Sequence, residues 1–217
     1  HIFGAHERTV NGVKGVLFNV WAPKALSVSV VGEFNKYDGR VHLMEKIGDT
    51  GVFELFIPGL AAGCGYMYEI KRQGKGTTRK LDPVSRQISS VPITASVVSD
   101  ENMSDSYAWN DGLWMIKRKK EAGKKKPVTV YEVSLTDWLK EKSADELVDF
   151  VKQEGYTHVC FLPVAEYLNE EMNGYSTLGY FAVTHRTGGS DAFKKLVDDC
   201  HNAGIGVIME RNRSEER

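Results

Sequence analysis

The hydrophobic pattern of this chain changes about halfway along, and that change limits the folds open to it. Between residues 13 and about 98, apolar residues alternate with their neighbours in short runs, as Val16, Phe18 and Val20 do. An alternation of period two is typical of half-buried strands. From Pro127 onward, strand-like apolar runs alternate with helical patterns. The sequence therefore predicts an antiparallel β-fold followed by parallel βαβ units.

Turn residues separate the predicted strands of the first half. Asp38-Gly39, Pro58-Gly59 and Gly74-Lys75-Gly76 each lie between two alternating runs. Short strands separated by such turns are typical of sandwiches. We expect residues 1–110 to form an immunoglobulin-like antiparallel β-sandwich.

Helix signals punctuate the second half. Ser143 and Glu146 have the spacing of a capping box, and Ser190 is a candidate N-cap for a second helix. The predicted strands cover residues 128–135, 158–164 and 205–209. Three parallel strands are too few to close a barrel of eight. Residues 128–217 are therefore expected to form the first three β/α units of an incomplete (β/α) TIM-type barrel.

A basic segment, residues 111–127, joins the two predicted domains. It contains two lysine-rich runs, at 117–120 and 124–126, and it ends at Pro127. Such a run can bind an anionic polymer, but no aromatic platform is interleaved with the charges. Like charges repel and extend a chain, so the pattern favours a solvated linker.

Charge and cysteine content narrow the possible partners. The 217 residues include 28 Lys and Arg and 29 Asp and Glu, giving a net charge of −1. This balance argues against a nucleic-acid partner, and no apolar run approaches the ~20 residues of a membrane span. Nor does the chain open with a signal peptide. Three cysteines without C-x-x-C spacing favour a cytoplasmic location.

Cofactor and metal motifs do not stand out. The six histidines form no i, i+4 pair and have no cysteine at metal-ligand spacing. Neither a phosphate-binding loop of the G-x-x-x-x-G-K-[ST] type nor a G-x-G-x-x-G follows a strand. We expect neither a metal nor a cofactor.

Several motifs in one order suggest a family. They resemble the carbohydrate-binding module of family 48, and the start of the glycoside hydrolase family 13 barrel, in bacterial glycogen branching enzymes. The segments that carry the resemblance lie at residues 15–23, 28–35, 51–60, 66–70, 130–135, 161–164, 179–182 and 200–208.

The resemblance implies α-1,4 to α-1,6 glucosyl transfer in glycogen synthesis, by a retaining double displacement that uses two carboxylates. In that family the catalytic carboxylates lie at the ends of the fourth, fifth and seventh barrel strands. This chain reaches only the third predicted strand. It therefore resembles the N-terminal portion of such an enzyme. We expect no catalytic residue in it and no branching activity from the chain alone.

The resemblance also marks positions around the substrate site. Tyr175 corresponds to the tyrosine that stacks on the sugar beside the cleaved bond. Glu210 and Glu215 stand where the family has an aspartate and a substrate-binding histidine, so Glu210 marks a degenerate site position. The departures at 173–176 and 183–188 add to this pattern. They are consistent with a relaxed or pseudoenzyme lineage, or with a truncated or frameshifted product.

A loop in the first half is the candidate glucan platform. Phe34, Asn35 and Tyr37 precede Asp38-Gly39, and aromatic rings beside an amide suit an α-glucan. The resemblance places tryptophan at position 37, so Tyr37 offers less stacking area. The alternative is that this loop packs against the barrel.

Besides an enzyme fragment, two other hypotheses for the function of the whole chain remain open. Glu132, Asp137, Glu166 and Glu210 are the carboxylates near predicted strand ends, and they suit rim or salt-bridge roles better than catalysis. The chain is then either a non-catalytic glucan-binding vestige or an interaction protein. In the second case, the open edge of residues 205–210 pairs with another copy to form a homo-oligomer.

Overall fold

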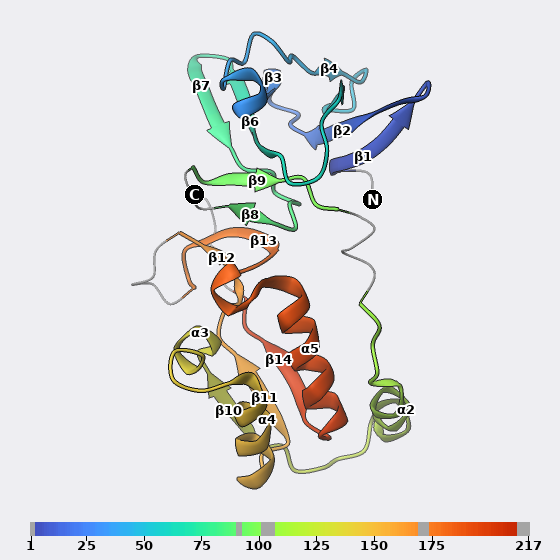
Figure 1. Ribbon diagram of the computed structural model, residues 1–217, viewed down its shortest axis with the longest axis vertical. Helices are drawn as coiled ribbons and strands as arrows, with labels where there is room; N and C mark the ends of the chain where they lie inside the picture. The colour runs from blue at the N-terminus through green and yellow to red at the C-terminus, as the bar shows by residue number, and fades with distance from the viewer. Residues whose placement is uncertain (1–2, 90–92, 101–106, 169–173, 212–217) are drawn as a thin grey trace. The chain divides into compact units, whose positions relative to one another are not determined.

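The computed structural model describes residues 3–89, 93–100, 107–168 and 174–211 (Figure 1). The chain divides into two compact units. The first unit comprises His1–Ser106 with Leu178–Ala182, and the second comprises Tyr107–Thr177 with Val183–Arg217. The finer division, with a separate linker at 111–127, stays a prediction.

Two antiparallel sheets build the first unit. One has the order β1-β2-β5-β4, and the other has the order β3-β6-β9-β8, with β7 also paired to β6. The strands are β1 (Gly4–Val10), β2 (Val13–Trp21), β3 (Ala25–Val31), β4 (Glu45–Lys46), β5 (Val52–Pro58), β6 (Gly65–Arg72), β7 (Lys75–Lys80), β8 (Ile88–Ser89) and β9 (Ala95–Val97).

Both sheets contribute to one hydrophobic core. Val16 and Phe18 of β2 pack in the same buried cluster as Val28 of β3 and Tyr66 of β6. The alternate residues of these strands point to the other face of each sheet, because successive side chains point to opposite faces, and some of them, such as Asn19 and Ser29, are buried there. The antiparallel sandwich predicted from the period-two pattern is confirmed.

A buried carboxyl group ties β6 to the segment that follows β7. Asp82 is 1% exposed, and its Oδ2 accepts hydrogen bonds from the hydroxyls of Tyr66 at 2.6 Å and Tyr68 at 3.3 Å. Burial raises the pKa of Asp82, and the hydrogen bonds from the two tyrosines oppose that rise. This network fixes the core side of β6.

The second unit has a parallel sheet of order β10-β11-β14. Its strands are β10 (Val130–Val133), β11 (His158–Phe161) and β14 (Gly206–Met209), and α4 (Ala144–Gln153) and α5 (Gly189–Asn202) lie between them in the chain. The shorter elements of the second unit are α3 (Leu135–Trp138), β12 (Ala165–Tyr167) and the 3-10 helix η3 (His185–Thr187). In β13 (Thr177–Val183), residues Leu178–Ala182 belong to the first unit. The predicted alternation of strands and helices is confirmed.

The start of one helix is confirmed and the start of the other was predicted wrongly. Ser143 Oγ accepts a hydrogen bond from the Glu146 amide, and the Glu146 carboxylate accepts one from the Ser143 amide, as in a capping box. The second helix begins at Gly189, so Ser190 is not its cap. Gly188 precedes it with a φ of 85°, which glycine adopts without strain.

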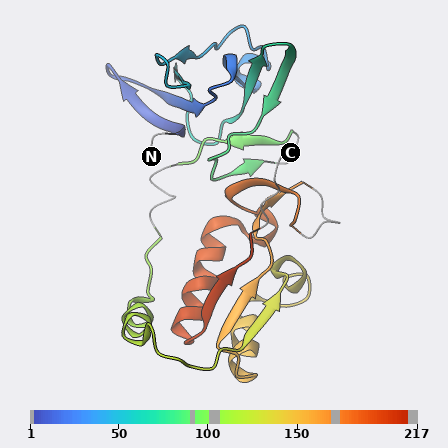
Figure 2. The same cartoon turned by 180° about the vertical axis from the view of Figure 1, so that it is seen from behind.

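In the part of the chain that the structure describes, helices cover one face of the parallel sheet. Val133, Val159 and Phe161 share a buried core with residues of α4 and α5. The opposite face, here called the open face, carries the row Glu132, Cys160 and Ile208. Figure 2 shows this side of the three strands without a helix in front of it. Ile208 is 41% exposed.

The basic segment predicted as an extended linker instead contains helix α2 (Gly112–Glu121). The Trp114 ring stacks on His201 of α5 with ring centroids 3.8 Å apart, and His201 Nδ1 lies 2.7 Å from Asp111 Oδ2. Asp198, also on α5, accepts hydrogen bonds from the Asn110 amide and the Tyr107 hydroxyl. The expected extended conformation is wrong here, because these aromatic and carboxylate contacts anchor the segment despite its charge.

Candidate functional site

The carboxyl ends of the parallel strands bring two of the predicted site residues together. Glu210 follows β14, and its amide donates a hydrogen bond to the Phe161 carbonyl at the end of β11. The Tyr175 hydroxyl donates a hydrogen bond to Glu210 Oε1 at 3.0 Å. The two positions that the resemblance assigned to the sugar site are thus in direct contact. Glu215 lies outside the described residues.

The electrostatics of this cluster keep its hydroxyl and thiol protonated. The hydrogen bond to Glu210 raises the pKa of Tyr175, and burial and the charges of Glu210 and Glu132 add to that rise. Burial raises the pKa of the Cys160 thiol, as do the same two carboxylates. Cys160 is therefore a poor nucleophile. The cluster can hydrogen-bond a sugar hydroxyl, with the carboxylates as acceptors.

The other two candidate carboxylates are occupied by neighbouring side chains. Asp137 Oδ1 accepts a hydrogen bond from Lys140 Nζ at 2.7 Å, and this ion pair lowers the pKa of Asp137. Glu166 is 1% exposed and pairs with Arg186 Nη1 at 2.7 Å. These contacts give both groups the salt-bridge role that the sequence favoured.

Asn35, predicted as a sugar ligand, is instead directed into the first unit. It lies in η1 (Glu33–Asn35), is 7% exposed, and its Oδ1 accepts a hydrogen bond from the Gly32 amide at 3.0 Å. Its Nδ2 donates to the Val30 carbonyl and lies 2.9 Å from His42 Nδ1. An amide with both ends satisfied internally holds the loop rather than offering itself to a ligand.

Phe34 and Tyr37 differ in how much of each side chain packs against the sandwich. Phe34 is half-buried, packs against the core of the sandwich, and its ring centroid lies 5.6 Å from that of His42. Tyr37 is half-exposed, and the guanidinium carbon of Arg79 lies 5.7 Å from the centroid of its ring. Of the three residues predicted for this loop, Tyr37 is the best placed to meet a ligand.

Arg79 contacts the candidate residue Tyr37 and was missed by sequence reasoning. It lies on β7, 42 residues from Tyr37, and its Nη2 donates a hydrogen bond to the Tyr37 carbonyl at 2.8 Å. Glu69 of β6 holds the same guanidinium at 3.0 Å, and the two residues are register partners. The sequence signal that could have located Arg79 is the turn at Gly74, because a hairpin around that turn places Glu69 opposite Arg79.

Among the described residues, no group of three or more His, Cys, Asp and Glu side chains is arranged to hold a metal ion. Within the same part of the chain, no helix is long and apolar enough to cross a membrane.

Comparison with known proteins shows which families this chain is similar to. Residues 2–85 match the model of the carbohydrate-binding module 48 (isoamylase N-terminal domain) family. The chain is 43% identical over 219 residues to the 1,4-alpha-glucan branching enzyme GlgB of Methylococcus capsulatus, an alignment that covers 96% of this chain. The chain resembles the N-terminal portion of a 1,4-alpha-glucan branching enzyme.

A second relative and a solved structure agree. The branching enzyme GlgB of Thiobacillus denitrificans is 44% identical, and again 96% of this chain is covered. The chain spans about 29% of the length of these curated relatives. The catalytic module of the pneumococcal virulence factor SpuA, described as glycogen-degrading, has a TM-score of 0.64 at 22% identity. The structural alignment covers 95% of this chain and 36% of the SpuA chain. This likeness shows that the fold is shared.

Proposed function

We propose that the first unit binds α-glucan at Tyr37 and that the second unit begins a barrel of the branching-enzyme type. The observation that carries the glucan part is the Tyr37 ring, which lies beside the Arg79 guanidinium in a unit whose sequence matches a carbohydrate-binding module. A ring with one apolar face and a polar edge suits a pyranose.

The backbone at Tyr37 supports a pre-formed binding surface. Lys36 and Tyr37 have φ angles of 54° and 57°, which non-glycine residues rarely adopt. The Tyr37 amide donates a hydrogen bond to the Gly32 carbonyl at 2.9 Å, and Arg79 holds the Tyr37 carbonyl. Such strain persists only where the surroundings fix it, and it is concentrated at functional sites. The ring therefore loses little freedom on binding.

Replacing Tyr37 tests this assignment. Tyr37→Ala removes the stacking surface at a half-exposed position, so we expect glycogen affinity to fall about 5- to 30-fold, equivalent to about 1–2 kcal/mol. Affinity electrophoresis of the 217-residue chain in gels containing glycogen measures this change. Trp21, which is 62% exposed in the same unit, provides the matched control as Trp21→Ala. Equal retention of wild type and Tyr37→Ala would refute the assignment.

The parallel sheet supports the barrel part of the proposal. Its open face carries Glu132, Cys160 and Ile208, and within the described ranges neither β10 nor β14 has a strand partner on its outer edge. Unpaired strand edges and an uncovered apolar residue are what the first three strands of a larger barrel present. The resemblance puts the catalytic carboxylates on later strands, so the chain by itself is proposed not to transfer glucosyl units.

The open edge of β14 also supports a second candidate function, in which the chain is an interaction protein. A second copy that pairs along Gly206–Met209 would satisfy the same backbone groups. Dimerisation that depends on concentration, and that is lost in a folded Val207→Pro variant, would favour this alternative over a barrel fragment.

We also propose a cytoplasmic location. Cys64, Cys160 and Cys200 are all free thiols. Free thiols in a chain of this kind are typical of reducing compartments.

A further inference from the structure

Helix α2 combines exposed apolar residues with a concentration of positive charge, and the glucan proposal explains neither. Leu113 is 84% exposed, Ile116 is 54% exposed and Met115 is 46% exposed. None of the ten residues of the helix is buried. Exposed apolar residues that cluster, unlike scattered ones, mark an interaction surface.

The charge of this segment differs sharply from that of the whole chain. Residues 111–127 contain seven Lys and Arg but two Asp and Glu, in a chain whose net charge is −1. Lys126 is paired with Glu121 at 2.7 Å. The other lysines of the segment have no ion-pair partner in the described part of the chain: Lys117, Lys119, Lys120, Lys124 and Lys125. These ammonium groups are available to an anionic partner.

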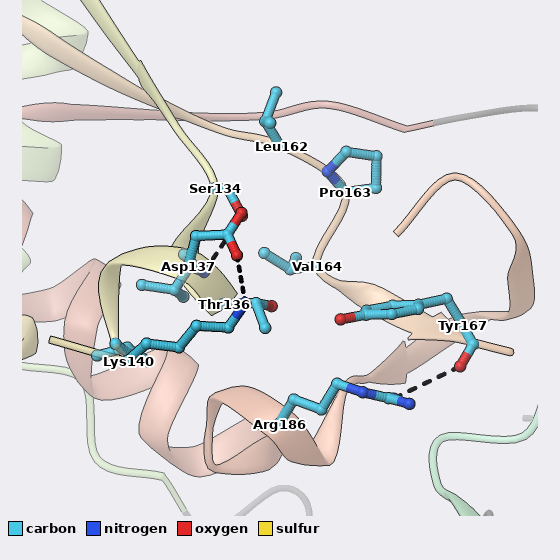
Figure 3. Close-up of a pocket in the computed structure, with 11 residues that line it drawn as sticks. Ser134, Thr136, Asp137, Lys140, Leu162, Pro163, Val164, Tyr167 and Arg186 are labelled. Atoms are coloured by element: carbon cyan, nitrogen blue, oxygen red, sulfur yellow. Dashed lines mark hydrogen bonds and ion pairs between the residues drawn. The ribbon is translucent and has the colours of Figure 1, made fainter. Parts of the chain in front are cut away.

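A cation in the same unit shows the contrasting case. Lys140 lies beside the cavity next to α3, and its Nζ is 2.7 Å from Asp137 Oδ1 (Figure 3). An anion entering that cavity would have to compete with a carboxylate that is already in place. No such competition exists at the five lysines of the α2 segment.

The apolar and the basic residues of α2 share one side of the helix. One helical face, with the spacing i, i+3, i+4, i+7, carries both kinds of residue, namely Leu113, Ile116, Lys117 and Lys120. Trp114 points in a different direction and stacks on His201 of α5. Helix α5 therefore holds α2 in place, while this face, here called the exposed α2 face, lies in solvent.

The residue types favour an anionic lipid surface over a nucleic acid or an acidic protein. Six of the seven cations are lysines, which act as point charges on flexible stems, whereas arginine pairs bidentately with carboxylates and phosphates. The one arginine of the segment, Arg118, lies over the Trp114 ring, 5.6 Å from its centroid. That ring already contacts His201 and Arg118, so it offers no free platform to a base. Exposed leucine and isoleucine gain from contact with acyl chains.

We propose that the exposed α2 face binds the surface of a membrane that contains anionic lipid. Leu113 and Ile116 enter the headgroup region, and the lysines lie against the charged headgroups. A cluster of about four to eight Lys and Arg residues on a helix with an apolar side is typical of such contacts. A helix that lies on the surface does not need to span the bilayer. The inference does not depend on the glucan proposal, because it involves neither Tyr37 nor the sandwich.

Sedimentation of the 217-residue chain with lipid vesicles tests the proposal. The chain should bind mixed phosphatidylserine and phosphatidylcholine vesicles about tenfold or more tightly than phosphatidylcholine alone, and salt should weaken this binding. Lys117→Gln combined with Lys120→Gln should weaken it about 5- to 30-fold. Leu113→Ala keeps the charge and the helix propensity, and it should weaken binding about two- to fivefold through lost apolar contact.

The matched control removes the same charge elsewhere. Arg72→Gln combined with Lys75→Gln changes two exposed cations of the β6–β7 hairpin, and we expect vesicle binding to stay within about twofold of wild type. Lys124→Gln combined with Lys125→Gln is a second test variant. It lies beyond the end of α2, so its loss of binding cannot come from an unfolded helix.

The possible outcomes separate the lipid proposal from its alternatives. Equal binding of the wild-type chain to both kinds of vesicle would overturn it, as would equal losses in the Lys117→Gln/Lys120→Gln variant and the hairpin control. Tighter binding to polyuridylate or to poly-glutamate than to the mixed vesicles would overturn the lipid assignment in favour of a nucleic acid or an acidic protein. The vesicles contain no glucan, so this proposal and the Tyr37 proposal fail separately.

Discussion

Replacing Glu166 with alanine is expected to lower the free energy of unfolding of the second unit by about 3–5 kcal/mol. The side chains of Glu166 and Arg186 are 2% and 16% exposed, so the arginine would keep its charge in a place that water barely reaches. The Thr184 hydroxyl and the His185 amide would lose their acceptor as well. A loss of this size is what removing one partner of a buried ion pair produces.

Urea denaturation followed by tryptophan fluorescence measures this loss. Three of the four tryptophans, Trp109, Trp114 and Trp138, belong to the second unit, so a Trp21→Phe background makes the signal specific for it. Asp191→Asn is the matched control, because it breaks an exposed i, i+3 pair with Lys194 and should cost less than about 0.5 kcal/mol. A Glu166→Ala chain within 1 kcal/mol of wild type would contradict the buried network.

The two faces of the parallel sheet should respond very differently to truncation. Phe161 is fully buried under the helices, and Phe161→Ala is expected to cost about 3–5 kcal/mol through lost burial and the cavity left behind. Ile208 is 41% exposed on the open face, and Ile208→Ala should cost less than about 1 kcal/mol. The same fluorescence-detected denaturation, in the Trp21→Phe background, compares them.

The pair of variants also tests whether the open face is open in solution. If a second copy or another part of the chain covers it, Ile208→Ala will cost several kcal/mol, and its midpoint will shift with protein concentration if the cover is a second copy. Equal losses for Phe161→Ala and Ile208→Ala would mean that the sheet is covered on both sides.

Local signals in the sequence were enough to predict the strands of the sandwich core and the alternation of strands and helices in the second half. The capping box at Ser143 and Glu146 involves groups three residues apart, and the period-two runs of the sandwich reflect side chains along one strand. Such features depend on neighbouring residues alone, so a single sequence contains them.

Features that depend on how the chain folds back on itself could not be predicted in this way. Asn35 was predicted to face a ligand, but its amide is held by Val30, Gly32 and His42, all within seven residues of it, in a loop whose closed conformation the residue types do not specify. Arg79 meets Tyr37 through strand pairing across 42 residues. A residue type that suits a sugar also suits an internal hydrogen bond, and only the fold decides between the two.

Helix α2 was not predicted from the sequence, for a related reason. The lysine pattern predicts an extended, solvated segment, yet the aromatic and acidic residues at its start lie against α5. Trp114 and Asp111 meet His201, which is about 90 residues away in the chain. The charged residues lie on the exposed side of helix α2, whereas the contacts with α5 determine the position of the helix in the second unit.

The central proposal is that this chain binds α-glucan and begins a branching-enzyme barrel, and that it does not transfer glucosyl units by itself. The measurement that tests it most directly is the number of α-1,6 branch points that the purified 217-residue chain forms in amylose, counted by enzymatic debranching of the product. We predict no branch points above those of an enzyme-free control, in a preparation shown to be retained by glycogen. New branch points formed by this chain alone would contradict the proposal, because carboxylates such as Glu132, Asp137, Glu166 or Glu210 would then have to supply the chemistry.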